Sequence, residues 1–251
     1  MLFLHSNYYS LEKTKSTIDN YYVVRAENPE AFTNWSYDEI AKSHQTYEMV
    51  ELEGLTPRGH KVLVYRLKDY DPSKIVFLEA LRTFLAFNDV IISEDGLCPG
   101  YEVVFDMKGT TLTHLARVAS ALHLVKMFMV YIQECHPVRL KAVHVINTVS
   151  FMDSVLSLVK PLMQSELVHL LILHNSLDTL EEFVPLKMMP RDYGGDGPPV
   201  GAAQESYDKF MKAKYSSWLK ECHHWAADLK KRPQKSKTNG MEGSFRTLQI
   251  D

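Results

Sequence analysis

Cysteine is scarce in this sequence, and the cysteines that occur are far apart. Cys98, Cys135 and Cys222 form an odd count, and no two of them have the CxxC spacing. A disulfide framework needs paired cysteines, and structural zinc sites bring their cysteine ligands in closely spaced pairs. The sequence therefore argues against both kinds of site, and it fits a reducing compartment.

Long hydrophobic runs and a strong net charge are also missing. The longest apolar run, residues 119–132, is interrupted by His123 and Lys126 and is shorter than the roughly 18 residues that span a bilayer. The N-terminus MLFLHSNYYS lacks the charged start and long apolar core of a signal peptide. The formal net charge of −3 argues against a nucleic-acid partner held by bulk electrostatics. We expect a soluble, cytoplasmic protein.

The common catalytic motifs are absent as well. The sequence contains no GxSxG nucleophile elbow, no GxxxxGK[ST] phosphate loop, no GxGxxG after a strand and no HExxH. Its glycine-rich residues 194–197 neither follow a predicted strand nor open a helix, so they indicate a surface turn. A hydrolase would need a nucleophile, a base and an oxyanion hole, and no motif supplies them. We therefore predict no catalytic residue and no cofactor.

Eleven histidines are present, but their spacing does not indicate a metal site. They show no repeated i, i+3 or i, i+4 pairing with carboxylates, which would bring ligands together on one helix face. His169 and His174 are five apart, so on one strand they would lie on opposite faces. We interpret His144, which lies within a predicted strand, as a hydrogen-bonded core residue rather than a catalytic base.

Predicted strands alternate with predicted helices through the centre of the chain. Short runs rich in Val, Ile and Tyr are typical of strands, and longer apolar periodicity is typical of helices. This alternation predicts an α/β protein with a largely parallel sheet. Strands are expected at residues 60–67, 100–107, 139–146 and 167–173, and helices at residues 11–25, within 36–50, and at 74–87, 111–118, 120–135, 150–163 and 177–183.

Residues 139–163 combine a buried strand with an unusually apolar helix. The strand is mostly apolar on both faces, as in sheets that helices cover on both sides. In the helix, Phe151, Val155 and Val159 belong to an apolar arc roughly 160° wide, which is broader than the stripe of a surface helix. The pattern alone leaves two interpretations open. The helix packs on the sheet, or it covers an apolar cavity and can swing away from it.

Five short motifs follow one another along the chain: D-x-x-G at residues 106–109, IN at 146–147, KP at 160–161, HN at 174–175 and MPRDYGG at 189–195. Together they resemble the motifs of the CRAL-TRIO lipid-binding domain family. Their combination is specific because they occur in the family's order along much of the chain. The predicted strand at residues 60–67 also looks like the family's first strand, and the C-terminal tail is similar to that of insect members of the tocopherol transfer and retinaldehyde-binding type.

The resemblance implies a mixed, mostly parallel sheet that forms the floor of a lipid pocket covered by apolar helices. It implies one noncovalently held hydrophobic ligand, such as a tocopherol-, retinoid- or carotenoid-like lipid, that is transferred between membranes without catalysis. The helix at residues 150–163 would close this pocket as a gate. The ligand-binding residues carried over from the family are Phe105, Phe128, Tyr131, Val138, Leu140, Val143, Phe151, Val155, Leu158 and Val159.

Two cations mark the start of the third predicted strand. Arg139 and Lys141 are two apart, so their side chains share a face. Together with Lys160 they would suit a lipid head group or an anionic membrane surface, and a solvated strand end is the alternative. The resemblance places Arg139 and Lys141 in a basic cluster that engages phosphatidylinositol bisphosphate. The cluster is only partly present, because its other positions hold Asn7, Glu166 and Leu170.

The resemblance also divides the chain into parts. Residues 1–55 would be a shortened remnant of the helical segment that precedes the domain, residues 56–195 the lipid-binding domain, and residues 196–251 a helical tail. In the tail we expect an exposed linker at residues 230–239 and a docking segment at 243–251. A monomer with transient membrane contact is expected. The alternatives are a phosphoinositide or phospholipid transfer or signalling module, and an interaction module whose pocket is filled by side chains.

Overall fold

The computed structural model describes residues 1–232, and a five-stranded mixed sheet forms its centre. The strands lie in the order β1-β2-β3-β4-β5, so neighbours in the sheet are also consecutive in the sequence. β1 is antiparallel to β2, and every other neighbouring pair is parallel. The predicted α/β class with a mostly parallel sheet is confirmed. The strands are β1 (Tyr47–Glu51), β2 (Lys61–Leu67), β3 (Tyr101–Asp106), β4 (Leu140–Ile146) and β5 (Leu171–Leu173).

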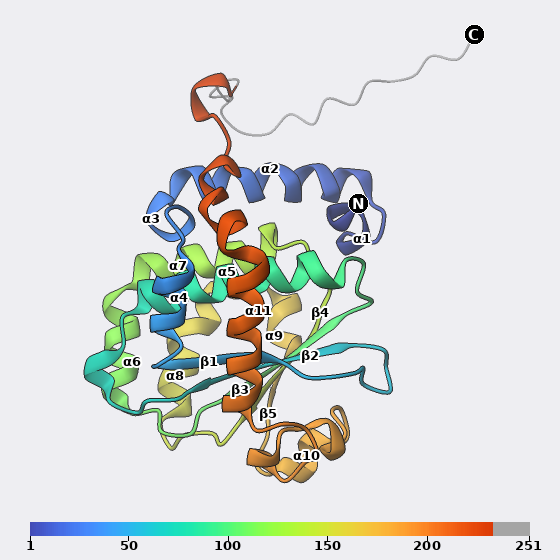
Figure 1. Ribbon diagram of the computed structural model, residues 1–251, viewed down its shortest axis with the longest axis vertical. Helices are drawn as coiled ribbons and strands as arrows, with labels where there is room; N and C mark the ends of the chain where they lie inside the picture. Colours follow the sequence, from blue (N-terminus) through green and yellow to red (C-terminus); the bar gives the residue numbers. More distant parts are fainter. Residues whose placement is uncertain (233–251) are drawn as a thin grey trace.

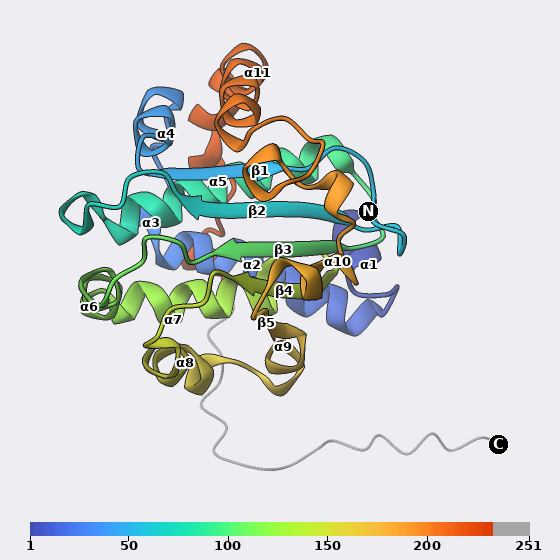
Figure 2. The same cartoon turned by 90° about the horizontal axis from the view of Figure 1, so that it is seen from below.

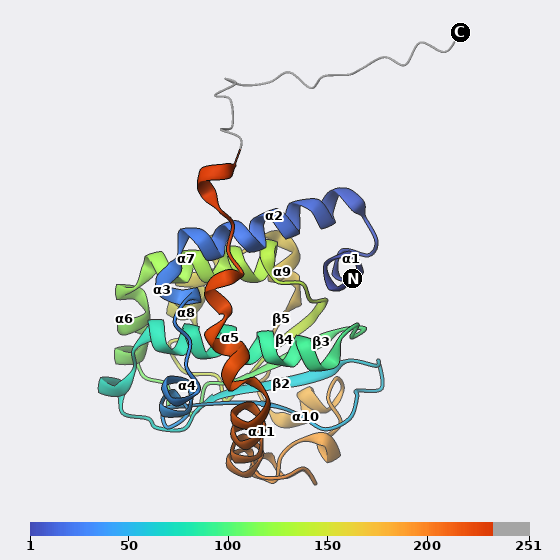
Figure 3. The ribbon, with the colours of Figure 1, turned by 45° about the horizontal axis from the view of Figure 1, so that its top comes forward.

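Helices form two layers on one face of the sheet (Figure 1). The first layer, α5 and α7, lies on the strands, and α2 crosses above it. Figure 3 shows α11 passing the β1 edge of the sheet and reaching up toward α2. The helices of these layers and of the N-terminal region are α1 (Leu2–Ser6), α2 (Leu11–Glu27), α3 (Pro29–Phe32), α4 (Tyr37–Ser43), α5 (Phe77–Asp95), α7 (Leu122–Val130) and α11 (Val200–Lys220).

The remaining helices surround the other sides of the sheet. Figure 2 places α6 and α8 beyond the end of the sheet where β3 finishes, and α9 beside β5. Among residues 1–232 no single helix is long and apolar enough to cross a bilayer, and the one pair that passes jointly, α6 with the α7 region, is bent by 79°. These helices are α6 (Leu112–Ser120), α8 (Met152–Val159), α9 (Ser165–Leu170) and α10 (Leu177–Glu181).

Alternating side chains give the sheet two separate apolar faces, because successive residues of a strand point in opposite directions. Val62, Val64 and Val104 pack with Leu180 of α10 on one face. Leu63, Tyr65, Tyr101 and Val103 pack toward Phe87 and Ile91 of α5 on the other. The sheet is therefore covered on both sides, as the strand predicted at residues 139–146, apolar on both faces, indicated.

Local signals explain where several helices begin and end. The Ser10 hydroxyl accepts a hydrogen bond from the Lys13 amide at 3.4 Å and caps α2, as expected for an N-cap serine. α5 continues well past the predicted end at Phe87. Its polar residues Asn88 and Asp89 are accommodated by side-chain hydrogen bonds, Asn88 to the Phe84 carbonyl and Asp89 to Arg25.

Two predicted elements are wrong in part. The stretch 36–50 is helical only in α4, and its second half forms β1, whose residues pair with β2 and are largely buried. The sheet therefore starts at Tyr47, inside the part expected to be purely helical. The stretch 167–173 begins in α9 and is extended only over β5, since periodicity does not distinguish a short apolar strand from a buried helix. The expected docking segment at 243–251 and most of the expected linker at 230–239 lie outside the described residues.

Candidate functional site

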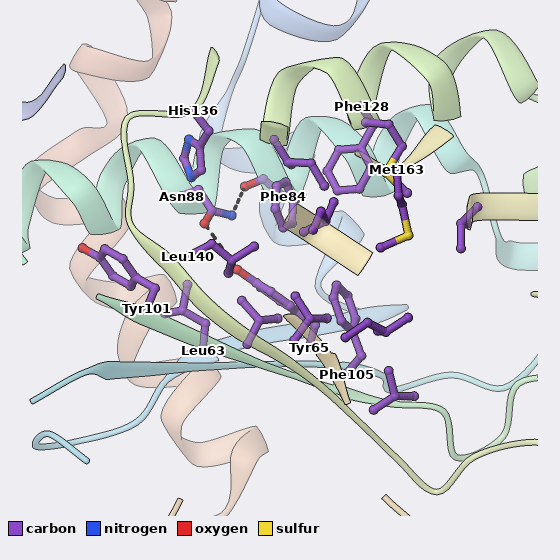
Figure 4. A pocket seen from close by; sticks show the side chains of 18 of the residues that line it. Leu63, Tyr65, Phe84, Asn88, Tyr101, Phe105, Phe128, His136, Leu140 and Met163 are labelled. Atoms are coloured by element: carbon purple, nitrogen blue, oxygen red, sulfur yellow. Dashed lines mark hydrogen bonds between the residues drawn. The ribbon is translucent and has the colours of Figure 1, made fainter. Parts of the chain in front are cut away.

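A cavity of about 300 Å³ lies between the sheet and the first helical layer. Its floor comes from strands β2 to β5, its roof from α5 and α7, and its remaining wall from α8 and α9. Figure 4 shows aromatic and aliphatic side chains converging on it from the sheet and from the helices. This arrangement fits an apolar ligand held between the two layers, and no lining residue carries a formal charge at neutral pH.

Strand alternation explains which residues of the floor reach the cavity. Tyr101, Val103 and Phe105 of β3 line it, whereas Glu102 and Val104 point to the opposite face, where both are fully buried. In the parallel register Val103 lies beside Val143 of β4, which also lines the cavity. A continuous apolar floor follows from this pairing.

α8 closes one side of the cavity with a regular stripe. Met152, Val155, Leu156 and Val159 follow the i, i+3, i+4, i+7 spacing of one helix face, and all four line the cavity. No residue of α8 is fully buried, although five of its eight residues are aliphatic or methionine. The helix therefore lies over the cavity and is not packed into the core.

A second cavity, of about 260 Å³, adjoins the first on the side of β1. The two share the aromatic residues Tyr65, Phe84, Phe105 and Phe128. Ring centroids within this group are 5.0 to 5.4 Å apart, which is contact distance for aromatic pairs. These rings lie between the two cavities.

The structure places seven of the ten predicted ligand-binding residues on the cavity wall. They come from β3, α7, β4 with the turn before it, and α8, which agrees with a site built from both layers. The seven are Phe105, Phe128, Val138, Leu140, Val143, Val155 and Val159.

The other three predicted residues lie off the cavity wall. Tyr131 opens a π-helical turn (η2, Tyr131–Cys135), where the extra residue per turn changes the direction of the side chains. Its ring is buried instead against Phe32, with centroids 5.4 Å apart. Phe151 precedes α8 as its N-cap residue, and Leu158 is turned away from the i, i+3, i+4, i+7 stripe.

Residues that sequence reasoning missed include Met152 and Leu156 on α8 and the polar pair Asn88 and His136. The first two belong to the apolar arc of residues 150–163, so the helical period could have identified them. Asn88 lies beyond the predicted end of α5, and His136 lies in a turn. Neither residue belongs to a periodic sequence pattern from which the direction of its side chain could be derived.

The cations Arg139 and Lys141 do share a face, and the N-terminal segment covers part of it, so both residues are half-buried. The Arg139 Nε donates to the His5 carbonyl at 2.9 Å, and its guanidinium lies 4.2 Å from the centre of the Tyr8 ring. The Lys141 ammonium donates to the Tyr8 hydroxyl at 2.9 Å. Lys160 is exposed at the end of α8, in the 3-10 turn η3 (Lys160–Leu162).

His144 is a buried, hydrogen-bonded core residue, as predicted. It lies on the face of the sheet opposite the cavity and joins the His174 Nε2 at 2.9 Å and the Glu102 carboxylate at 3.1 Å. Burial raises the pKa of Glu102, but hydrogen bonds from His144 and His60 outweigh it, so that pKa is lower than usual. Among residues 1–232 no three histidine, cysteine or carboxylate side chains converge as a metal site would require.

Comparison with known proteins connects this geometry to a family. The family model described as the CRAL/TRIO domain matches residues 45–195, which is more than half of the chain and includes the whole sheet and both cavities' floors. The chain belongs to the CRAL/TRIO domain family. This confirms the family expected from the sequence motifs, and the family is one of lipid-binding and lipid-transfer proteins.

Curated relatives match at low identity. A Mus musculus protein named alpha-tocopherol transfer protein-like is 25% identical over 221 residues, covering 87% of this chain. Rattus norvegicus Clavesin-1 is 23% identical over 183 residues, covering 71% of this chain. The chain spans only 63% and 51% of the length of these two relatives. The crystal structure of Sfh5 aligns with 76% of this chain and 73% of its own, at a TM-score of 0.50 and 14% identity, and supports the fold alone.

Proposed function

We propose that this CRAL/TRIO protein binds one small hydrophobic lipid in the cavity under α8 and transfers it between membranes. The observation that carries the proposal is the almost purely apolar cavity closed by a helix with no fully buried residue. The ligand class is a tocopherol-, retinoid- or carotenoid-like lipid, and the name of the mouse relative, alpha-tocopherol transfer protein-like, agrees with it. The protein acts as a carrier in the cytoplasm and not as an enzyme.

Burial of apolar surface supplies the affinity in this proposal. A lipid that removes about 400 Å² of apolar surface from water gains on the order of 10 kcal/mol at about 25 cal/mol per Å². The costs of association and of ordering the ligand are subtracted from this gain. Only the surplus over these costs appears as affinity. A fully enclosed ligand can enter or leave only if part of the cavity wall moves.

α8 is the wall that moves in the proposed mechanism. Its C-terminal end is tied to η2, because the Gln133 side chain donates to the Leu162 carbonyl at 3.1 Å and accepts from the Gln164 amide at 2.6 Å. Its N-terminal end follows Asn147, which has a positive φ of 49°. With one end anchored, the apolar face of α8 would turn outward into a membrane and release the lipid.

Freshly purified protein is expected to carry a stoichiometric lipid adduct in native mass spectrometry. Replacement of Val143 by phenylalanine should remove the adduct, because the larger side chain projects from the cavity floor. The matched control is Val130→Phe, which adds the same bulk at a position on α7 that is 43% exposed and lies off the cavity wall. If the wild-type protein shows only the mass of the polypeptide, both as purified and after incubation with lipid vesicles, the result would favour an interaction module with a filled pocket.

Membrane contact through Arg139 and Lys141 is the second part of the proposal. Tyr8, which is 63% exposed, lies beside these cations, and the next residue, Tyr9, is 60% exposed. Exposed tyrosines suit a membrane interface. A cation near an anionic bilayer contributes about 1 kcal/mol. Arg139→Gln with Lys141→Gln should therefore weaken binding to vesicles containing phosphatidylinositol bisphosphate by roughly 30-fold in a sedimentation assay.

Two further variants separate this surface from general charge attraction. Lys160→Gln tests whether the end of the proposed gate also meets the membrane, and a loss of about fivefold is expected. Lys220→Gln, at the end of α11, removes the same charge from an unrelated exposed position and should leave binding unchanged. Equal losses in all variants would contradict a defined membrane-contact surface.

A further inference from the structure

A chain of hydrogen-bonded acidic and basic side chains crosses the face of the sheet opposite the cavity. The His60 Nδ1 is 2.7 Å from one oxygen of Glu102, and the His144 Nε2 is 3.1 Å from the other. The His144 Nδ1 is 2.9 Å from the His174 Nε2, and the His174 Nδ1 is 2.8 Å from the Thr179 hydroxyl. The chain runs from the start of β2 through β3 and β4 to the end of β5 and to α10, which lies on this face (Figure 1).

Most of this chain is buried. Glu102 and His144 are completely buried, His174 is 3% exposed, and only the His60 end approaches solvent. Among residues 1–232 the ion-pair partners of Glu102 are His60 and His144, and neither lysine nor arginine pairs with it. Burying an ionised carboxylate without a counter-charge is very costly, so the positive charge is expected within the chain itself.

The hydrogen bonds of the chain require one proton more than two neutral imidazoles hold. The Thr179 hydroxyl donates its only proton to the Ser176 carbonyl at 2.9 Å, so it accepts from the His174 Nδ1. At the other end an ionised Glu102 can only accept, so the His144 Nε2 carries a proton. The bond between the two rings needs a third proton, on either of its nitrogens. Two neutral imidazoles hold two protons, and this pair holds three.

The extra proton belongs to the coupled chain, and the same count results if the carboxyl group takes it. A protonated Glu102 would donate to the His144 Nε2, and both rings would then be neutral. Burial raises the pKa of Glu102, but hydrogen bonds from His144 and His60 keep it below its usual range. Burial and the neighbouring His144 lower the pKa of His174. Both directions favour an ion pair of the carboxylate with the ring between it and His174.

We propose that this chain keeps its extra proton through pH 8 and thereby holds β5 and α10 on the sheet, so that loss of the proton at higher pH loosens this edge. The device does not depend on the proposed lipid-carrier function. Without the proton, either the bond between the rings or the bond from Thr179 to Ser176 is lost, and the charge of Glu102 stays buried. β5 has only three residues and pairs with β4 alone, so few other contacts hold it.

The charged groups on neighbouring elements do not replace the proton. The Arg58 guanidinium lies 4.7 Å from the centre of the Phe183 ring, which packs against both imidazoles of the pair. Lys141 borders the solvent-side end of the chain, and Glu182 at the end of α10 favours a proton on the ring nearest to it. Asp106, on the same face of β3, has its own partners. In the described part of the protein none of these four charged groups is hydrogen-bonded to the chain.

Glu102→Gln provides the test, because it completes the same chain without an extra proton. The glutamine oxygen can accept from His60, and its amide can donate to the His144 Nε2 while both rings stay neutral. Histidines of the unfolded chain are neutral above about pH 6.5, so only the folded wild type carries the extra proton and its stability must fall as pH rises. Urea unfolding followed by tryptophan fluorescence should show this fall. Relative to Glu102→Gln, the unfolding constant of the wild type should rise about tenfold from pH 7 to pH 8.

His60→Asn is the matched control. Asparagine places an amide at the position of the Nδ1, so it keeps the hydrogen bond to Glu102 and removes the titratable ring at the solvent-side end. This variant should keep the pH dependence of the wild type. Equal pH dependence in wild type and Glu102→Gln, or its loss in His60→Asn, would overturn the assignment of the proton to the buried part of the chain.

Two further measurements do not depend on unfolding. Nitrogen-15 NMR of the histidine rings at pH 8 should show three protonated nitrogens on His144 and His174 together in the wild type, and two in Glu102→Gln. Hydrogen exchange, corrected for its intrinsic pH dependence, should show β5 and α10 opening about tenfold more often at pH 8 than at pH 7 in the wild type only. Two neutral rings in the wild type at pH 8, or unchanged opening of β5 and α10, would overturn the proposal and leave the carrier function standing.

Discussion

Replacing Val155 by aspartate is expected to abolish ligand retention while the fold persists. Val155 lies in the α8 stripe that lines the cavity, and no lysine or arginine lines the cavity to neutralise a carboxylate there. A polar group left without a partner in an apolar site costs about 2 kcal/mol or more, which is roughly 30-fold in affinity. Retinol titration and the lipid adduct in native mass spectrometry measure the loss. The circular dichroism spectrum should be unchanged because no residue of α8 is fully buried.

Ser154 provides the matched control on the same helix. It precedes Val155 directly but lies on the exposed face, so Ser154→Asp adds the same charge outside the cavity. This variant should keep both the adduct and the rate of lipid transfer between vesicles. Equal ligand loss in the two variants would point to a general effect of charge on α8, and unchanged retention in Val155→Asp would remove α8 from the ligand site.

The sequence motifs that identify the family build the scaffold of the site rather than its wall. The Asp106 carboxylate accepts hydrogen bonds from the Lys108 amide and the Asn147 side chain at 2.8 Å, and from the Tyr193 hydroxyl at 2.9 Å. D-x-x-G, IN and YGG thus meet in one cluster at the ends of β3 and β4. Gly109 has a φ of 78°, and a side chain there would collide with the Tyr70 ring. Each of these motifs has a fixed spacing of a few residues, so it can be found in the sequence.

The residues that line the cavity were less predictable, because they depend on how each helix is rotated about its axis relative to the sheet. The apolar arc of residues 150–163 predicted a helix at the right place, but only the face with Met152, Val155 and Val159 meets the cavity. At Tyr131 the π-helical turn shifts the direction of the side chain, and helical periodicity contains no signal for it. Periodicity identifies an apolar helix face, whereas the partner of each residue on it is set by tertiary packing.

Contacts between segments far apart in the sequence could likewise not be predicted from sequence patterns. Arg139 and Lys141 were predicted to share a face, which follows from strand geometry. That Tyr8 lies against both cations depends on the path of α1 and α2 across the helical layer. Buried polar residues such as Arg25 gave no signal either, because a charged residue on a helix usually indicates a solvent-exposed face.

Replacing Asp89 by alanine is expected to cause the largest loss of stability, about 3–5 kcal/mol. The Asp89 carboxylate pairs with the Arg25 guanidinium at 2.5 Å, and both side chains are at most 3% exposed. This pair joins α2 to α5, above the roof of the cavity. Without Asp89, the Arg25 charge would remain buried among aromatic rings, whose cation–π attraction offsets only part of the cost of its desolvation. Urea unfolding followed by tryptophan fluorescence measures the change in free energy.

The double variant Arg25→Met with Asp89→Leu distinguishes a buried unpaired charge from loss of packing. Buried ion pairs replaced on both sides by apolar residues of similar size are often close to neutral in stability. The double variant should therefore recover at least half of the stability that Asp89→Ala loses, although it contains more substitutions. A double variant no more stable than Asp89→Ala would show that the loss comes from packing of α2 on α5. A loss below about 1 kcal/mol in Asp89→Ala would contradict a structural role for the pair and would separate α2 from the stability of the cavity roof.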